Sequence, residues 1–226
     1  VNKYLGETID IHSGGKDLIF PHHENEIAQS EAVNGKPFAN YWLHNGFINV
    51  DNRKMSKSEG NFFTVRDIVK EFDYQTIRFF MLSAHYRSPI NFSKDLVTQA
   101  DTGLKRIHNT VKNLMFILEN ASDLPVSDKE KEAFDGFLAY KDKFKEAMDD
   151  DLNTADAISH IFTLVRDVNT QIKNDVEYSK KYIEDTISLI NELCNVLGIG
   201  VAVKVSMSIF LLTSLILSFL NMLMKI

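Results

Sequence analysis

The sequence predicts an α/β segment followed by an all-α helical bundle. Residues 1–92 mix short apolar runs, glycine turns and helix-like stretches, whereas residues 93–198 repeat apolar side chains at spacings of three and four. Such spacings are typical of amphipathic helices packed around a common core. We therefore expect a mixed domain over 1–92, a helical bundle domain over 93–198 and an atypical apolar segment over 199–226.

The elements of the first segment are placed by turn and breaker residues. Apolar runs at 9–11 and 18–20 lie on either side of a glycine turn at 13–15. Pro21 is well suited to the first turn of a helix, and we expect that helix to run over about 22–33.

The rest of this segment contains a strand and two helices. Aromatic and β-branched residues over 41–50 predict the strand. Thr64 and Asp67 resemble a capping box that opens a helix to about Phe72, and another helix is expected over 73–84.

Four helices are expected in the bundle. The first is long and is broken at Pro125, and a capping box of Ser127 and Glu130 opens the second. Asn153 marks the start of the third, and the fourth carries Cys194 among isoleucines and leucines. A buried small hydrophobic side chain explains that cysteine better than a nucleophile does.

Composition limits the class of protein. The 226 residues are 44% hydrophobic and 25% charged, with a net charge of −6. This charge excludes a generally basic nucleic-acid-binding protein, so RNA contacts have to come from local basic patches. One cysteine excludes an intrachain disulfide and predicts a reducing, cytoplasmic setting.

The apolar run over 209–224 is borderline in length for a membrane helix, which needs about 20 apolar residues. Membrane insertion, a helix buried against the bundle and a non-native tail are the three alternatives for this stretch.

One loop carries two lysines three residues apart, with small hydroxyl residues between and after them. The loop reads Lys54-Met55-Ser56-Lys57-Ser58 and is followed by Glu-Gly-Asn. A mobile pair of cations suits the neutralisation of a departing polyphosphate. For an isolated pair of lysines, a solvated basic turn is the alternative.

A second motif could hold a metal ion. On a helix, His22 and Glu26 share a face, and an imidazole nitrogen and a carboxylate oxygen at that spacing can chelate zinc. His23 lies off that face and needs another role. Zinc takes about four ligands, so this is half a site. Acids near the positive end of a helix are the alternative reading.

A glycine turn precedes these residues. His12 is a candidate acid, base or hydrogen-bond donor, and Asp17 could pair with a substrate amine. The glycines between them allow a ligand to approach the backbone closely. Taken alone, this motif is also compatible with a simple turn.

These motifs follow one another in a known order. The order is His-Ser-Gly-Gly-Lys-Asp-Leu, Phe-Pro-His-His-Glu-Asn-Glu, Tyr-Trp-Leu-His, Lys-Met-Ser-Lys-Ser and Asn-Phe-Phe-Thr-Val-Arg-Asp. Together they closely resemble the cysteinyl-tRNA synthetases, a class I aminoacyl-tRNA synthetase family, from residue 4 to about 198. The resemblance implies the C-terminal half of a Rossmann-like catalytic domain, then a tRNA-binding helical domain. The run Asp-Asp-Asp-Leu-Asn-Thr at 149–154 also resembles that helical domain.

The resemblance also implies an activity, the activation of cysteine with Mg²⁺ and ATP and its transfer to tRNA(Cys). In the family, zinc binds the thiolate of the substrate, which selects cysteine over serine and alanine. The implied zinc ligands are His22 and Glu26, and His12 and Asp17 match residues of the cysteine pocket. Within the ATP-binding loop over 54–58, the implied catalytic residues are Lys54 and Lys57.

Two family features are missing from this sequence. The two zinc-binding cysteines and the His-Ile-Gly-His motif for ATP lie N-terminal to anything present here. The chain is therefore expected to be inactive alone and to need the missing N-terminal half as its partner. Two other functions stay open, a non-catalytic tRNA- or nucleotide-binding remnant and a related cysteine ligase that acts on an amino sugar.

Overall fold

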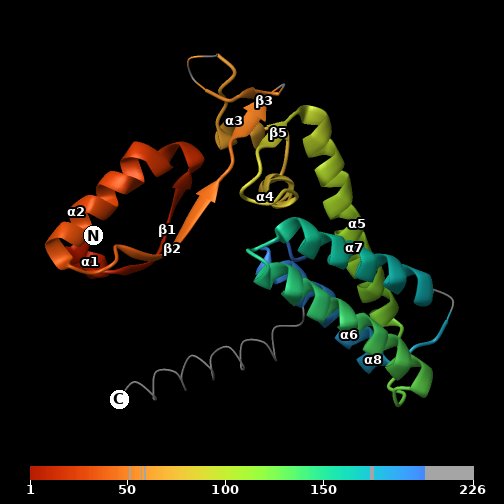
Figure 1. Cartoon of the computed structure of the whole chain (residues 1–226). Coiled ribbons are helices and arrows are strands. Elements are labelled where there is room, and N and C mark those ends of the chain that lie inside the picture. The colour runs from red at the N-terminus through yellow and green to blue at the C-terminus, as the bar shows by residue number, and fades with distance from the viewer. Residues whose placement is uncertain (51, 57, 59, 174–175, 202–226) are drawn as a thin grey trace.

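The computed structural model describes residues 1–50, 52–56, 58, 60–173 and 176–201. It consists of a mixed α/β part and a helical part, arranged side by side in Figure 1. This confirms the predicted fold class. Among the described residues, every helix is too short or too polar to cross a membrane. The apolar run over 209–224 lies outside the described residues.

The first sheet is a parallel pair of strands connected through a helix. Strand β1 (Ile9–Gly15) pairs with β2 (Ala39–Asn45), and α2 (Glu24–Asn34) lies between them in the chain. A short helix α1 (Asn2–Leu5) precedes β1. The helix predicted over 22–33 is present as α2, but a 3-10 turn η1 (Lys16–Leu18) and a π turn η2 (Ile19–His23) come before it.

The second sheet has the strand order β4-β3-β5. Strand β3 (Ile48–Val50) runs antiparallel to β4 (Arg53–Lys54) and parallel to β5 (Ile90–Phe92). The single strand predicted over 41–50 is thus two strands in two different sheets, which join at 46–47.

Gly46 is required at this junction. Its backbone N–H donates to the carbonyl of Tyr86, with 2.7 Å between nitrogen and oxygen. A Cβ at Gly46 would lie 2.4 Å from the carbonyl carbon of Ser88. The segment before β5 therefore crosses the junction at a distance that only glycine permits.

Two short helices lie between β4 and β5 in the chain. The predicted capping box of Thr64 and Asp67 is present, but α3 (Val65–Ile68) ends sooner than the predicted Phe72. The next helix is α4 (Tyr74–Leu82), and Asp73 caps its N-terminus by accepting from Gln75 N.

The helical part contains the four predicted helices, α5 (Lys94–Glu119), α6 (Asp128–Asp149), α7 (Thr154–Gln171) and α8 (Lys180–Val196). Their apolar faces form one core, which Phe79 of α4 joins. The fully buried side chains include Ile107, Leu114, Phe137, Ile161, Leu164, Ile183 and Ile190.

The capping residues of the bundle agree with the sequence. Ser127 and Glu130 form the predicted capping box of α6, and Asn153 caps α7. Glu130 has a second partner, because its Oε1 accepts from the backbone N–H of Ser179, the cap of α8, at 2.8 Å. One carboxylate thus ties together the starts of α6 and α8.

Cys194 lies in the core, as predicted, with 1% of its surface exposed. Burial raises the pKa of its thiol to about 12. This cysteine is a buried hydrophobic side chain rather than a reactive one.

Candidate functional site

Side chains from three segments of the first sheet unit meet in one cluster. His12 comes from β1, His23 from the turn before α2, and Glu26 from the first turn of α2. The Nε2 atom of His12 lies 2.7 Å from Oε2 of Glu26. One ligand atom from each of the three lie within 4.8 Å of one another. The glycine turn and the His-Glu motif, separate in sequence, therefore form one site.

His23 is the buried centre of this cluster. Its Nδ1 lies 2.8 Å from Nε2 of His44 in β2. Gly14 makes room for it, because a Cβ there would lie 3.0 Å from the imidazole ring. Burial, then the nearby charges of His12 and His44, lower the pKa of His23. The imidazole is therefore neutral at neutral pH, the form that binds metal ions.

The donor atoms of the cluster fit a metal ion. Imidazole nitrogens and a carboxylate oxygen are a donor set that zinc accepts. The structure groups His12 and His23 with Glu26. It also brings His22 near Glu26, with 3.6 Å between Nε2 and Oε1, although the His22 side chain is 60% exposed. Glu26 is therefore shared by two possible ligand sets, one with His23 and one with His22. His22 stays a predicted ligand, and His23 is the alternative.

The lysine loop lies beside the glycine turn. Nζ of Lys54, at the end of β4, lies 3.5 Å from Oδ2 of Asp17 in η1. The same ammonium group lies 3.8 Å from the ring centroid of Phe47. Both charged side chains are half exposed, so a substrate can reach them. Asp17 pairs here with a protein cation, where the sequence suggested a substrate amine.

Asn61 closes the lysine loop from the other side. Its Oδ1 accepts from the backbone N–H of Ser56 at 2.9 Å, and its Nδ2 donates to the carbonyl of Lys54 at 3.3 Å. The hydroxyls of Ser56 and Ser58 are 3.1 Å apart. Lys57 lies outside the described residues.

Below the loop is an apolar cavity of about 160 Å³, which Met55 helps to line. Its other lining residues are Ile48, Phe63, Val65, Ile68, Ile77, Phe80, Met81, Phe92 and Val97. Met55 thus packs on apolar side chains, while the ammonium group of Lys54 lies beside the carboxylate of Asp17.

Sequence reasoning missed three residues of the site. His23 had no assigned role, because its contact with His44 joins two segments 21 positions apart. Asn61 gives no periodic signal, and only its place directly after the loop marks it. The motif Tyr-Trp-Leu-His did contain His44, but strand alternation alone does not say which residue it meets.

Both parts of the chain match known protein families. Residues 1–102 match the family described as tRNA synthetases class I (C) catalytic domain, and residues 143–202 match the DALR domain. A cysteine–tRNA ligase of Lachnospira eligens is 56% identical over 197 residues, and one of Clostridioides difficile is 54% identical over 199.

The chain belongs to the cysteine–tRNA ligase family. The alignments cover 87% of this chain but 41% and 42% of those two ligases, so the chain spans less than half of their length.

Solved structures support the fold of this ligase family member. A LeuRS–tRNA–LeuAMS complex of Agrobacterium radiobacter has a TM-score of 0.65 at 17% identity, covering 84% of this chain and 27% of that one. A Mycobacterium tuberculosis methionyl-tRNA synthetase with methionyl-adenylate has a TM-score of 0.66 at 17% identity, covering 83% and 41%. At such identities, the likeness concerns the fold alone.

Proposed function

We propose that this chain is the part of a cysteine–tRNA ligase that carries the lysine loop, half of the metal site and the helical domain. The observation that carries the proposal is the contact between Lys54 and Asp17. It places the lysine loop against the turn whose other end bears His12 and the Glu26 cluster. The proposed phosphate-neutralising group and the proposed amino-acid site would then be adjacent.

The proposed reaction has two steps. The carboxylate of cysteine attacks the α-phosphorus of ATP, which forms cysteinyl adenylate and expels pyrophosphate. A ribose hydroxyl of the 3′ end of tRNA(Cys) then attacks the acyl carbon, and AMP leaves. In the first step, negative charge grows on the departing pyrophosphate, where a nearby ammonium group stabilises it.

The proposed roles follow from position. Lys54 neutralises phosphate charge, together with Lys57, and Mg²⁺ accompanies ATP as the family resemblance implies. His12 and Asp17 lie at the two ends of the glycine turn. Their proposed role is to line the binding site of the substrate cysteine.

A zinc ion held by Glu26 with His22 or His23 would supply a soft Lewis acid for a thiolate. The hydrogen bond from His12 orients the Glu26 carboxylate, and this would position the carboxylate as a metal ligand.

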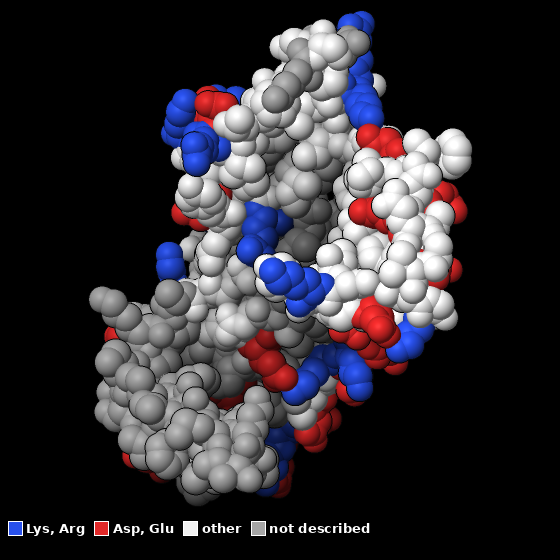
Figure 2. Space-filling view, turned by 90° about the vertical axis from the view of Figure 1, so that its left-hand side faces the viewer, with Lys and Arg blue, Asp and Glu red and all other residues white. Residues whose placement is uncertain are grey.

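The acceptor is proposed to be tRNA rather than an amino sugar. The two curated ligases align through 87% of the chain, which takes in the helical domain as well as the site. On the face in Figure 2, basic and acidic side chains are interspersed. With a net charge of −6, the contacts to tRNA are proposed to be local.

Complementation tests the proposal. The N-terminal part of the Lachnospira eligens ligase, co-expressed with this chain, is expected to restore cysteine-dependent ATP–pyrophosphate exchange. Lys54→Ala in the restored pair should lower the exchange rate by about 10²-fold, because one transition-state charge contact is lost. Lys36→Ala, which removes an exposed lysine paired with Glu7, is the matched control and should leave the rate unchanged.

Two other outcomes separate the alternatives. A folded pair without exchange, but with salt-sensitive tRNA binding by the chain, would indicate a binding remnant. Exchange without transfer to tRNA, but with transfer to an amino sugar, would indicate the related ligase.

A further inference from the structure

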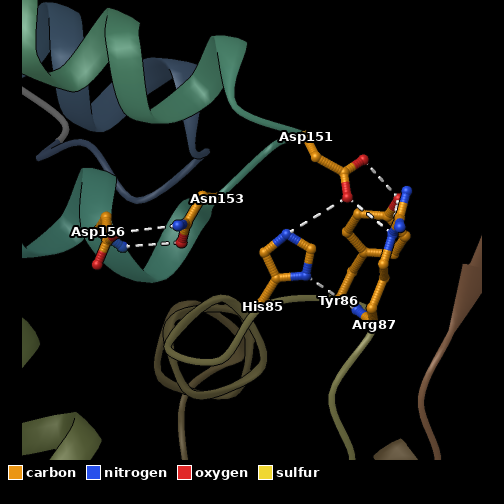
Figure 3. Close-up of polar contacts among 6 residues, drawn as sticks. All are labelled: His85, Tyr86, Arg87, Asp151, Asn153 and Asp156. Atoms are coloured by element: carbon orange, nitrogen blue, oxygen red, sulfur yellow. Dashed lines mark hydrogen bonds and ion pairs between the residues drawn. The ribbon is translucent and has the colours of Figure 1, made fainter.

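We propose that Asp151 positions Lys54 by fixing the junction of the two sheets through Tyr86 and Arg87. The catalytic consequence of this contact rests on the proposed function, whereas the positioning itself does not. Asp151 lies far from the site in sequence, in the turn between α6 and α7 of the helical part (Figure 3).

The turn holds Asp151 in an unusual backbone conformation. Asp151 and Leu152 have φ angles of 54° and 57°, in the left-handed region that side chains other than glycine and asparagine or aspartate seldom adopt. Backbone N–H groups of Leu152 and Asn153 donate to the carbonyls of Met148 and Ala147, each at 3.1 Å. The surrounding hydrogen bonds therefore impose this conformation.

This conformation directs the Asp151 carboxylate away from the bundle. Its Oδ1 accepts from the hydroxyl of Tyr86 at 2.8 Å, and its Oδ2 forms an ion pair with Arg87, 2.7 Å from Nε. Nε2 of His85 lies 3.7 Å from Oδ2. Figure 3 shows all three side chains turned toward the carboxylate, while Asn153 turns the other way to Asp156 and caps α7.

The three partners also hold one another. The Arg87 backbone N–H donates to Nδ1 of His85 at 3.2 Å, so the imidazole proton lies on Nε2, which faces Asp151. The rings of His85 and Tyr86 are stacked with centroids 4.9 Å apart. Nε of Arg87 donates to the Tyr86 hydroxyl at 3.0 Å. This hydrogen bond, and to a lesser extent the negative charge of Asp151, raises the pKa of Arg87. The segment 85–87 is thus a preformed receptor for one carboxylate.

This segment touches the sheet junction directly. The carbonyl of Tyr86 accepts from Gly46 N at 2.7 Å, and Ser88 packs against Gly46 where any side chain would clash. Gly46 separates β2, which bears His44, from β3, which pairs with the β4 strand of Lys54. A shift of segment 85–88 therefore changes the angle between the sheets and the gap between Lys54 and Asp17.

A second contact holds the helical part on α4 independently of Asp151. Oγ1 of Thr154 donates to the carbonyl of Leu82 at 2.8 Å, which holds the start of α7 on the end of α4. Loss of the Asp151 carboxylate is therefore expected to leave α4 in place and to release segment 85–87 alone.

Carbodiimide cross-linking of the full chain tests this inference. The reagent joins a carboxylate and an amine that are in contact, and peptide mass spectrometry then measures the Asp17–Lys54 amide. Asp151→Asn keeps a side chain that tolerates the left-handed region but removes the charge. We expect it to lower the Asp17–Lys54 yield about threefold, a modest effect because the carboxylate is 40% exposed.

Two controls make the result specific. Asp150→Asn removes the same charge one residue earlier, from an exposed side chain, and should change nothing, because the contacts with segment 85–87 are made by Asp151. The Lys141–Glu192 pair between α6 and α8, at 2.7 Å, is an internal standard for the bundle. Its yield should be equal in all variants.

An unchanged Asp17–Lys54 yield in Asp151→Asn would overturn the inference. If Asp151→Asn also lowers the Lys141–Glu192 yield, a second variant, Tyr86→Phe, is measured. It removes the Tyr86 hydroxyl and leaves the bundle untouched. An unchanged Asp17–Lys54 yield in Tyr86→Phe would also overturn the inference. In the complemented ligase, Asp151→Asn should lower kcat of exchange about threefold with KM for cysteine unchanged. A lower cross-link yield without any exchange activity would refute the proposed function and leave the positioning intact.

Discussion

At the scale of single residues, the site depends on which imidazole lies next to Glu26. His22 and His23 are neighbours in sequence, but the turn η2 makes one exposed and the other 3% exposed. A buried imidazole that is held by a neighbouring side chain makes a better-ordered ligand than a solvated one. The structure therefore offers two metal arrangements that share one carboxylate.

Metal affinity separates these arrangements. Glu26→Gln is expected to weaken zinc binding at least about tenfold in either case, because both use this carboxylate. His22→Asn and His23→Asn then show which imidazole binds zinc, since only substitution of the true ligand lowers the zinc affinity. Competition with a chromogenic chelator measures the affinity. Equal affinity in the wild type and Glu26→Gln would contradict both arrangements.

The thiol of Cys194 gives a second prediction. With a pKa raised to about 12, it should not react with a disulfide reagent at pH 8 in the folded chain and should react at once in denaturant. Above the ordinary pKa of 9.0, the unfolded state ionises this thiol and the folded state does not. The stability of the bundle should therefore fall as the pH rises from about 9 toward 12. Rapid labelling of the native chain would contradict the burial.

At the scale of elements, the sequence predicts helices better than sheet contacts. The caps at Ser127 and Asn153 depend on neighbours within four residues, so local patterns were sufficient. The division of the strand over 41–50 depends on Ser88, which packs on Gly46 from far along the chain. Likewise, the second partner of Glu130, Ser179, lies 49 residues away and has no local signal.

Glu130 gives a prediction for the bundle. Burial opposes ionisation of its carboxylate, but hydrogen bonds from Ser127 and Ser179 outweigh that effect and lower its pKa. A lowered pKa stabilises the fold above the unfolded value of 4.5 and loses this contribution as the pH falls through the folded value. Glu130→Gln should therefore lower stability by about 1 kcal/mol at pH 7.

Thermal unfolding of Glu130→Gln at two pH values checks this prediction. The difference from the wild type should shrink below about pH 4.5. Glu132→Gln, an exposed position on the same helix, is the control. A deficit of equal size at low pH would mean that packing, rather than charge, accounts for it.

At the scale of the whole molecule, the two parts are buried to very different extents. The bundle has a continuous core, whereas, among the described residues, β1 and β2 form a parallel sheet of two strands. Parallel sheets are normally covered on both faces, and here large apolar side chains are more than half exposed. They are Tyr4, Leu5, Ile11, Phe20 and Tyr41. We propose that the N-terminal half of the catalytic domain packs on these side chains.

Hydrogen exchange tests this difference. Amides in the interior of α7 and α8 should exchange at least about 10²-fold more slowly than those of β1 and β2, because fewer buried contacts hold the sheet. Adding the N-terminal part of the Lachnospira eligens ligase should protect the sheet and leave the bundle unchanged. Equal protection of sheet and bundle in the chain alone would contradict the prediction.

The aromatic environment of the histidine cluster gives the molecule an optical reporter of its own. Trp42 is the sole tryptophan of the sequence. Its ring centroid lies 4.9 Å from that of His12 and 5.2 Å from that of His23, and it stacks on His44. Indole emission responds to charge and hydration beside the ring. We therefore expect the intrinsic fluorescence of this chain to change, without any label, if a proton, a metal ion or an amino acid binds at the cluster.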